Sequence, residues 1–117
     1  MHVLVIDDDS IFCEVMKRTG LLRGIEVTTC SVLEKMNRPD TWKFDAAIVD
    51  YDLDYVDGVE LSEYIRHFGS TVPILLVSQT ARKARETWPH GISGFLPKSI
   101  GAQSILDEAL RLQSHSS

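Results

Sequence analysis

Short apolar runs alternate along the chain with longer stretches in which apolar residues recur at helical spacing. The apolar runs predict five strands, at residues 3–6, 25–30, 46–49, 72–77 and 94–96. The periodic stretches predict five helices, near residues 12–22, 32–36, 57–68, 81–88 and 105–112. Strands that alternate with helices imply a parallel sheet covered on both faces. We therefore expect an α/β, doubly wound fold.

The individual strands differ in polarity. The runs at 3–6 and 46–49 are wholly apolar, as parallel strands covered on both faces must be, whereas 25–30 is more polar and suits a sheet edge.

A length of 117 residues fits one compact domain. We place this domain at residues 1–113 and interpret residues 114–117 as a tail or linker.

Composition and charge narrow the class of protein. The chain has 12 Lys and Arg residues against 17 Asp and Glu, a formal net charge of −5. Because contacts with phosphate groups need a basic surface, this balance argues against direct nucleic-acid binding. Cys13 and Cys30 lie in apolar patterns without Cys-x-x-Cys spacing, which indicates reduced core residues. No apolar run approaches the roughly 20 residues that span a bilayer, and no signal-peptide pattern is present. We therefore expect a cytoplasmic protein without a membrane partner.

Polar residues follow four of the predicted strands directly. Asp7 and Asp8 end the first strand, Asp50 ends the third, Ser78 ends the fourth, and Lys98 follows the fifth. The carboxyl ends of the strands in an open parallel sheet share one edge, and ligands bind there. Residues far apart in the sequence therefore meet in one predicted site.

The charge and reactivity of each of these residues depend on the others. Three neighbouring carboxylates cannot all stay ionised unless a cation or a proton is bound between them, and carboxylate oxygens suit Mg²⁺. With its charge screened, Asp50 can attack phosphorus as a nucleophile and form an acyl phosphate. Lys98 and the metal would neutralise charge on the transferring oxygens. The Ser78 hydroxyl can donate a hydrogen bond to one of those oxygens.

Five segments together resemble the signature of the receiver domains of two-component response regulators. They are 5–9, 48–50, 57–58, 77–78 and 95–98, and they occur in the family's order over essentially the whole chain. The resemblance implies a CheY-like, flavodoxin-like (βα)5 fold with strand order 2-1-3-4-5. It also implies that the chain is not an enzyme in the usual sense, because it would catalyse only its own phosphorylation and dephosphorylation.

The resemblance also assigns the residues of a phosphorylation site. Asp50 would accept the phosphoryl group, with Lys98 beside it. Asp8 would bind Mg²⁺ directly and Asp7 largely through water, while Asp50 and the backbone carbonyl of Asp52 would complete the protein ligands. The phosphoryl donor would be a sensor histidine kinase or a phosphotransfer protein.

A switch and its output surface follow from the same resemblance. Ser78 matches the switch hydroxyl and Phe95 the switch aromatic, while Asp52, Gln79 and Thr80 occupy positions that modulate the site. Phosphorylation would be read by an output domain or a downstream protein. That partner would contact the face made by the fourth helix, the fifth strand and the fifth helix.

The sequence departs from the family pattern near the switch. Asp54 stands where the family often has Pro, and Gln79 replaces a smaller residue beside Ser78. Ser99 follows Lys98 where the family commonly has Pro after a cis bond, which would cost about 2.5–4 kcal/mol before Ser. The stretch from Ser78 to Lys98 is also slightly short, so the fourth helix is in doubt. These departures leave an alternative function, a receiver fold that serves as a protein-interaction module and is not phosphorylated.

Two other classes fit less well. Asp50-Tyr51-Asp52 after a buried strand resembles the nucleophile motif of haloacid-dehalogenase-type phosphohydrolases. That family places its acidic pair last, however, and the chain has no room for a cap domain. An EF-hand calcium loop starting at Asp50 would need Gly at its sixth position and Glu at its twelfth, where the chain has Tyr55 and Leu61.

Overall fold

The computed structural model describes residues 1–30, 44–51, 72–79 and 92–115. The strands in this part of the chain are β1 (His2–Ile6), β2 (Glu26–Cys30), β3 (Ala46–Asp50), β4 (Ile74–Ser78) and β5 (Gly94–Pro97). Its helical elements are α1 (Ser10–Leu22), the 3-10 turn η3 (Lys98–Ile100) and α3 (Ala102–His115). The predicted helices at 32–36, 57–68 and 81–88 lie outside the described residues. None of the described helices is both long and apolar enough to cross a membrane.

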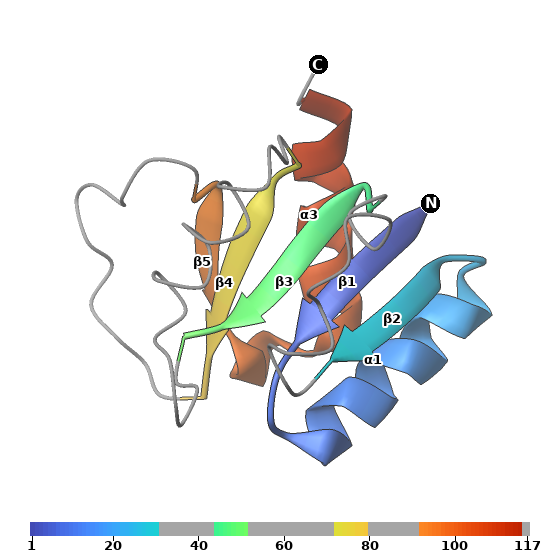
Figure 1. The fold of residues 1–117 in the computed structure, drawn as a ribbon, viewed down its shortest axis with the longest axis vertical. Helices are drawn as coiled ribbons and strands as arrows, with labels where there is room; N and C mark the ends of the chain where they lie inside the picture. Colours follow the sequence, from blue (N-terminus) through green and yellow to red (C-terminus); the bar gives the residue numbers. More distant parts are fainter. Residues whose placement is uncertain (31–43, 52–71, 80–91, 116–117) are drawn as a thin grey trace.

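The strands form a five-stranded sheet in the order β2-β1-β3-β4-β5, with every neighbouring pair parallel (Figure 1). This is the strand order that the sequence resemblance implied, and the expected α/β fold is confirmed. The more polar strand, β2, lies at one edge of the sheet, as its composition predicted.

One face of the sheet packs against α1 and α3, which also contact each other (Figure 1). Met16 of α1 and Ile105 of α3 join Val5, Ile48 and other sheet residues in one buried cluster. The alternate sheet positions are equally buried: Leu4, Ile6, Ala47, Val49, Ile74 and Leu76 are at most 3 % exposed. Because successive side chains on a strand point to opposite faces, both faces of the sheet are covered, as the apolar runs predicted.

Gly20 allows α1 to lie close to β2. A Cβ atom on Gly20 would lie 2.5 Å from Val27 Cγ2 and 2.8 Å from the carbonyl oxygen of Ile25. That carbonyl belongs to backbone whose N–H donates to Gly20 O at 2.8 Å, so it cannot move without disturbing this turn.

Replacing Gly20 by Ala is therefore expected to destabilise the fold, even though Ala is the better helix former. Overpacking of this kind costs about 1–3 kcal/mol, which urea unfolding would measure as a lower midpoint. Lys17→Ala, an exposed substitution on the same helix, should change stability by no more than about 0.5 kcal/mol. A Gly20→Ala variant as stable as wild type would show that α1 can move away from β2 without cost.

Candidate functional site

The strand register brings the ends of β1, β3, β4 and β5 together at one sheet edge. Ile6 pairs with Val49, so Asp7 lies level with Asp50, which itself pairs with Val77. Ser78 pairs with Pro97, which places Lys98 one residue beyond it. The structure therefore brings four of the predicted site residues to the same edge: Asp7, Asp50, Ser78 and Lys98.

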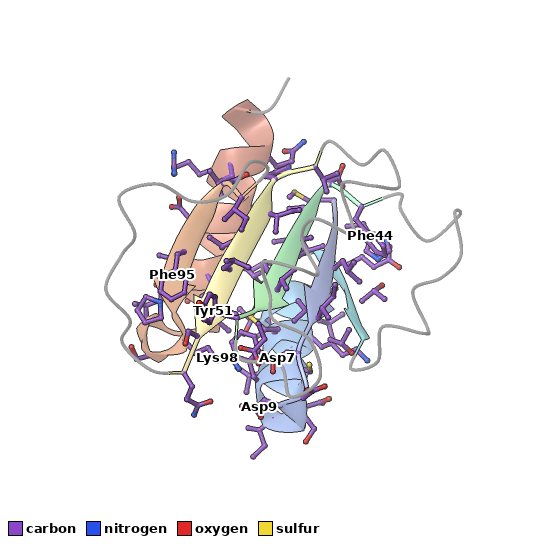
Figure 2. The ribbon with its side chains drawn as sticks, turned by 60° about the vertical axis from the view of Figure 1, so that its left-hand side comes forward. Asp7, Asp9, Phe44, Tyr51, Phe95 and Lys98 are labelled. Carbon is purple, nitrogen blue, oxygen red and sulfur yellow. The ribbon has the colours of Figure 1, made fainter. Side chains whose placement is uncertain are left out.

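Lys98 lies between two buried carboxylates. Its Nζ is 2.7 Å from Asp7 Oδ2 and 3.8 Å from Asp50 Oδ2. Asp7 is only 1 % exposed and Asp50 only 6 %, and the Lys98 side chain is 9 % exposed. Figure 2 shows Lys98 and Asp7 close together beyond the strand ends. Charges this deeply buried require partners, and here one ammonium group serves both carboxylates.

The two oxygens of Asp7 are held differently. Oδ1 accepts a hydrogen bond from the Asp9 N–H at 2.8 Å. Oδ2 is fully enclosed, and the Lys98 ammonium approaches it outside hydrogen-bond geometry, so this oxygen has an ionic partner but no hydrogen-bond donor. It is therefore a buried carboxylate oxygen that can still accept a further ligand of positive charge.

Asp9 has a structural function that we did not predict from the sequence. It is the N-cap of α1, and its Oδ1 accepts from the N–H groups of Ile11 at 3.0 Å and Phe12 at 3.2 Å. An Asp directly before a stretch of apolar residues at helical spacing is a known start signal for a helix. The sequence therefore contained the signal for this cap. The cap fixes the first turn of α1 against the site.

Asp8, between these two residues, is exposed. Of the Asp7 and Asp8 carboxylates, that of Asp7 is the one that pairs with Lys98. Among the described residues no group of three His, Cys, Asp or Glu side chains is arranged to hold a metal. The carbonyl of Asp52 lies outside those residues, as does Thr80. The metal ligand set of Asp7, Asp8, Asp50 and Asp52 stays a prediction.

Ser78 and Phe95 belong to the other face of the sheet. Strand alternation places Ser78 on the face opposite Asp50, because Asp50 pairs with Val77. Ser78 is completely buried. The half-buried Phe95 ring meets Tyr51 edge to face, with ring centroids 6.2 Å apart at 89° (Figure 2). Tyr51 directly follows Asp50. The aromatic pair, which we did not predict from the sequence, therefore places the predicted switch residue against the neighbour of the predicted acceptor.

Two of the residues that depart from the family pattern, Ser99 and Gln79, lie next to Lys98 or beside it in a groove. Ser99 follows Lys98 through a trans peptide bond and lies in η3, which the Gly101 N–H closes onto Lys98 O at 3.1 Å. Gln79 is exposed and lines a groove of about 250 Å³ together with Lys98 and Phe12. Gln79 therefore stands at the opening beside Lys98. Asp54 lies outside the described residues.

Cys13 contacts the site from α1. It is a free, half-buried thiol whose Sγ donates to the Asp7 carbonyl oxygen at 3.5 Å. Burial, followed by the charges of Asp7 and Asp9, raises the pKa of Cys13 to about 11. The thiol is therefore protonated at neutral pH and unreactive, in agreement with its interpretation as a reduced core residue. The side chain of Cys30 lies outside the described part of the chain.

Sequence comparison identifies the family. Residues 3–110 match the response regulator receiver domain. A putative two-component response regulator of Arabidopsis thaliana, ARR21, is 29% identical over 105 residues, which cover 86% of this chain and 17% of that protein. The response regulator MprA of Mycobacterium avium is 27% identical over 111 residues, covering 91% of this chain and 48% of the relative. The chain thus spans less than half the length of these relatives.

Solved structures of low sequence identity share the fold. A CheY-like receiver domain protein from Methanospirillum hungatei superposes with a TM-score of 0.84 at 18% identity, covering 98% of this chain and 94% of that one. The response regulator TrrA of Thermotoga maritima, solved in complex with Mg²⁺–BeF, gives a TM-score of 0.79 at 20% identity, covering 95% and 97%. With the match over residues 3–110, these likenesses show that the chain belongs to the receiver domain family of two-component response regulators.

Proposed function

We propose that this receiver domain accepts a phosphoryl group on Asp50 and uses the modification to switch a partner. The observation that carries the proposal is the position of Lys98, whose Nζ lies 2.7 Å from Asp7 and 3.8 Å from Asp50 at a buried sheet edge. A cation held beside a carboxylate nucleophile is what phosphoryl transfer requires, because its catalysis consists mainly of positioning and charge neutralisation.

The reaction needs few groups. An Asp50 carboxylate oxygen attacks the phosphorus of the donor, the bond from phosphorus to the donor atom breaks, and the donor leaves with that electron pair. Lys98 neutralises the charge that gathers on the transferring oxygens. By the family resemblance the Ser78 hydroxyl would donate to the phosphoryl group once it is bound. Ser78 ends β4 at the same sheet edge, although its side chain starts on the face of the sheet opposite Asp50.

The residues present fit a hard divalent cation. Asp7 Oδ2 is buried without a hydrogen-bond donor, and the available donors are carboxylate oxygens, which Mg²⁺ prefers. Asp7 and Asp50 would hold the ion, with Asp8 and the carbonyl of Asp52 as further ligands. Bound there, the ion would screen the carboxylates from an anionic donor. TrrA, of the same fold, was solved with Mg²⁺–BeF, which supports the assignment by analogy.

The donor would be a sensor histidine kinase or a phosphotransfer protein, and the chain would act on no separate substrate. Its own catalysis would be limited to gaining and losing the phosphoryl group. The output would pass through Ser78 and the Tyr51–Phe95 pair to the fourth helix, β5 and α3. A partner or an output domain would bind there.

The test is incubation of the chain with acetyl phosphate, with and without Mg²⁺, followed by intact-mass measurement. We expect the mass of one phosphoryl group to be added, and only when the divalent cation is present, because two buried carboxylates must otherwise meet an anionic donor. A chain that stays unlabelled beside a labelled control receiver would refute the proposal. It would favour the alternative, an interaction module that is never phosphorylated. The motivating features for that alternative are Gln79 beside Lys98 and Ser99 directly after it.

A further inference from the structure

The Lys98 ammonium has a third neighbour besides the two carboxylates. It lies over the face of the Phe12 ring, 4.6 Å from the ring centroid. A cation within about 6 Å of an aromatic centroid is attracted by the negative ring face, and the attraction grows when water is excluded. The Lys98 side chain is 9 % exposed, so this condition is met.

Phe12 is held in place independently of Lys98. Its N–H donates to the Asp9 side chain at 3.2 Å in the capped first turn of α1, and its side chain packs against the buried core cluster. The helix and the core therefore set the position of the ring, and the Lys98 ammonium lies against it. Two short segments, one after β1 and one after β5, thereby fix a single ammonium group.

The ring also lies beside Lys98 in the wall of a groove that is open to water. Phe12 and Lys98 both line the open groove of about 250 Å³ between the start of α1 and the start of α3. With Leu in place of Phe12 the core contact would largely remain, but the ammonium would lose the charge-attracting ring face. It would then have more freedom to turn from the carboxylates into the groove.

We propose that Phe12 is a positioning residue, which holds the Lys98 ammonium against Asp7 and Asp50 through its ring face and so sets the rate at which Asp50 is phosphorylated. This inference builds on the proposed function. In this proposal Phe12 acts through Lys98 and takes no part in the transfer itself.

Four variants measure the effect on rate. Phe12→Leu should slow labelling by acetyl phosphate about three- to tenfold, the range expected for loss of a desolvated cation–π contact. Phe12→Tyr and Phe12→Trp keep a ring face and should stay near the wild-type rate. Phe44→Leu is the matched control, because this ring lies against His2 at the other end of the sheet (Figure 2). Equal rates for wild type and Phe12→Leu would overturn the proposal.

Fluorinated phenylalanines at position 12 separate the ring charge from packing. Each added fluorine weakens the negative ring face with little change in shape, so the labelling rate should fall stepwise along the series. A flat series, with Phe12→Leu slow, would mean that Phe12 acts only by packing and would also overturn the proposal.

Proton NMR tests the contact without any phosphorylation. The Lys98 Cε protons should show an upfield ring-current shift in wild type that disappears in Phe12→Leu. A wild type without that shift would overturn the positioning contact itself. A wild type that shows the shift but takes up no phosphoryl group would instead refute the proposed function, and the rate claim with it.

Discussion

Asp50→Asn is expected to abolish labelling by acetyl phosphate while leaving the fold intact. Asn keeps the shape of the side chain at this buried, 6 % exposed position, but its amide lacks the anionic oxygen that attacks phosphorus. We expect the loss to be complete, because the neighbouring carboxylate, Asp7, is only 1 % exposed and is paired with the Lys98 ammonium. Intact mass after incubation with Mg²⁺ and acetyl phosphate measures the outcome, and circular dichroism checks the fold.

A matched control lies directly before the same strand. Asp45 precedes β3 at the opposite end of the sheet and accepts a hydrogen bond from the His2 N–H at 2.8 Å. Asn can still accept that bond, so Asp45→Asn should fold and label like wild type. Labelling that survives in Asp50→Asn would show that another residue is the acceptor, and the acceptor assignment would then be wrong.

The three central strands of the sheet, β1, β3 and β4, could be predicted because each has a strong local signal. Buried parallel strands must be apolar, and the runs around Val5, Ile48 and Leu75 satisfied that requirement. The boundaries were less accurate: the fourth strand was expected at 72–77 and is observed as Ile74–Ser78. Pro73, which lacks an N–H, precedes the observed strand, and Ser78 is still paired within the ladder.

The sequence also predicted which residues meet, through the rule that parallel strands end at one edge. This rule found Asp7, Asp50, Ser78 and Lys98 without any contact information. It treated Asp8 as equivalent to Asp7, yet in the structure Asp8 is exposed and Asp7 buried. The rule also does not say which face a residue is on, and the alternation of side chains along a strand separates the face of Ser78 from that of Asp50.

The contacts that the sequence did not predict are those between segments with no shared local pattern. Phe12 reads as an ordinary apolar position of a helix, and only the approach of the segment after β5 to the start of α1 places Lys98 over its ring. Tyr51 reads as part of an acidic loop, and only the β3–β4–β5 register brings it to Phe95. Such pairs depend on how separate elements pack, and periodicity contains no information about that packing.

Lys98→Met is the second large effect, and it should change stability and reactivity together. The substitution keeps the length of the side chain but leaves Asp7, which is 1 % exposed, without its ionic partner at 2.7 Å. Removing one partner of a buried pair costs about 3–5 kcal/mol, measurable by urea unfolding without added divalent cation. The labelling rate should fall by about 100-fold or more, as when a donor that stabilises transition-state charge is removed.

Lys98→Arg separates the two effects, because Arg restores the positive charge but spreads it over a planar fork. It should recover most of the lost stability through Asp7, and less of the rate, because the fork cannot lie as a point charge between Asp7, Asp50 and the Phe12 ring. Lys17→Met, an exposed lysine on α1, is the control and should leave both quantities unchanged. Should Lys98→Met lose stability but label at the wild-type rate, Lys98 would be a structural counter-ion of Asp7 only. Phosphoryl transfer to Asp50 would then have to rely on the divalent cation alone for charge neutralisation.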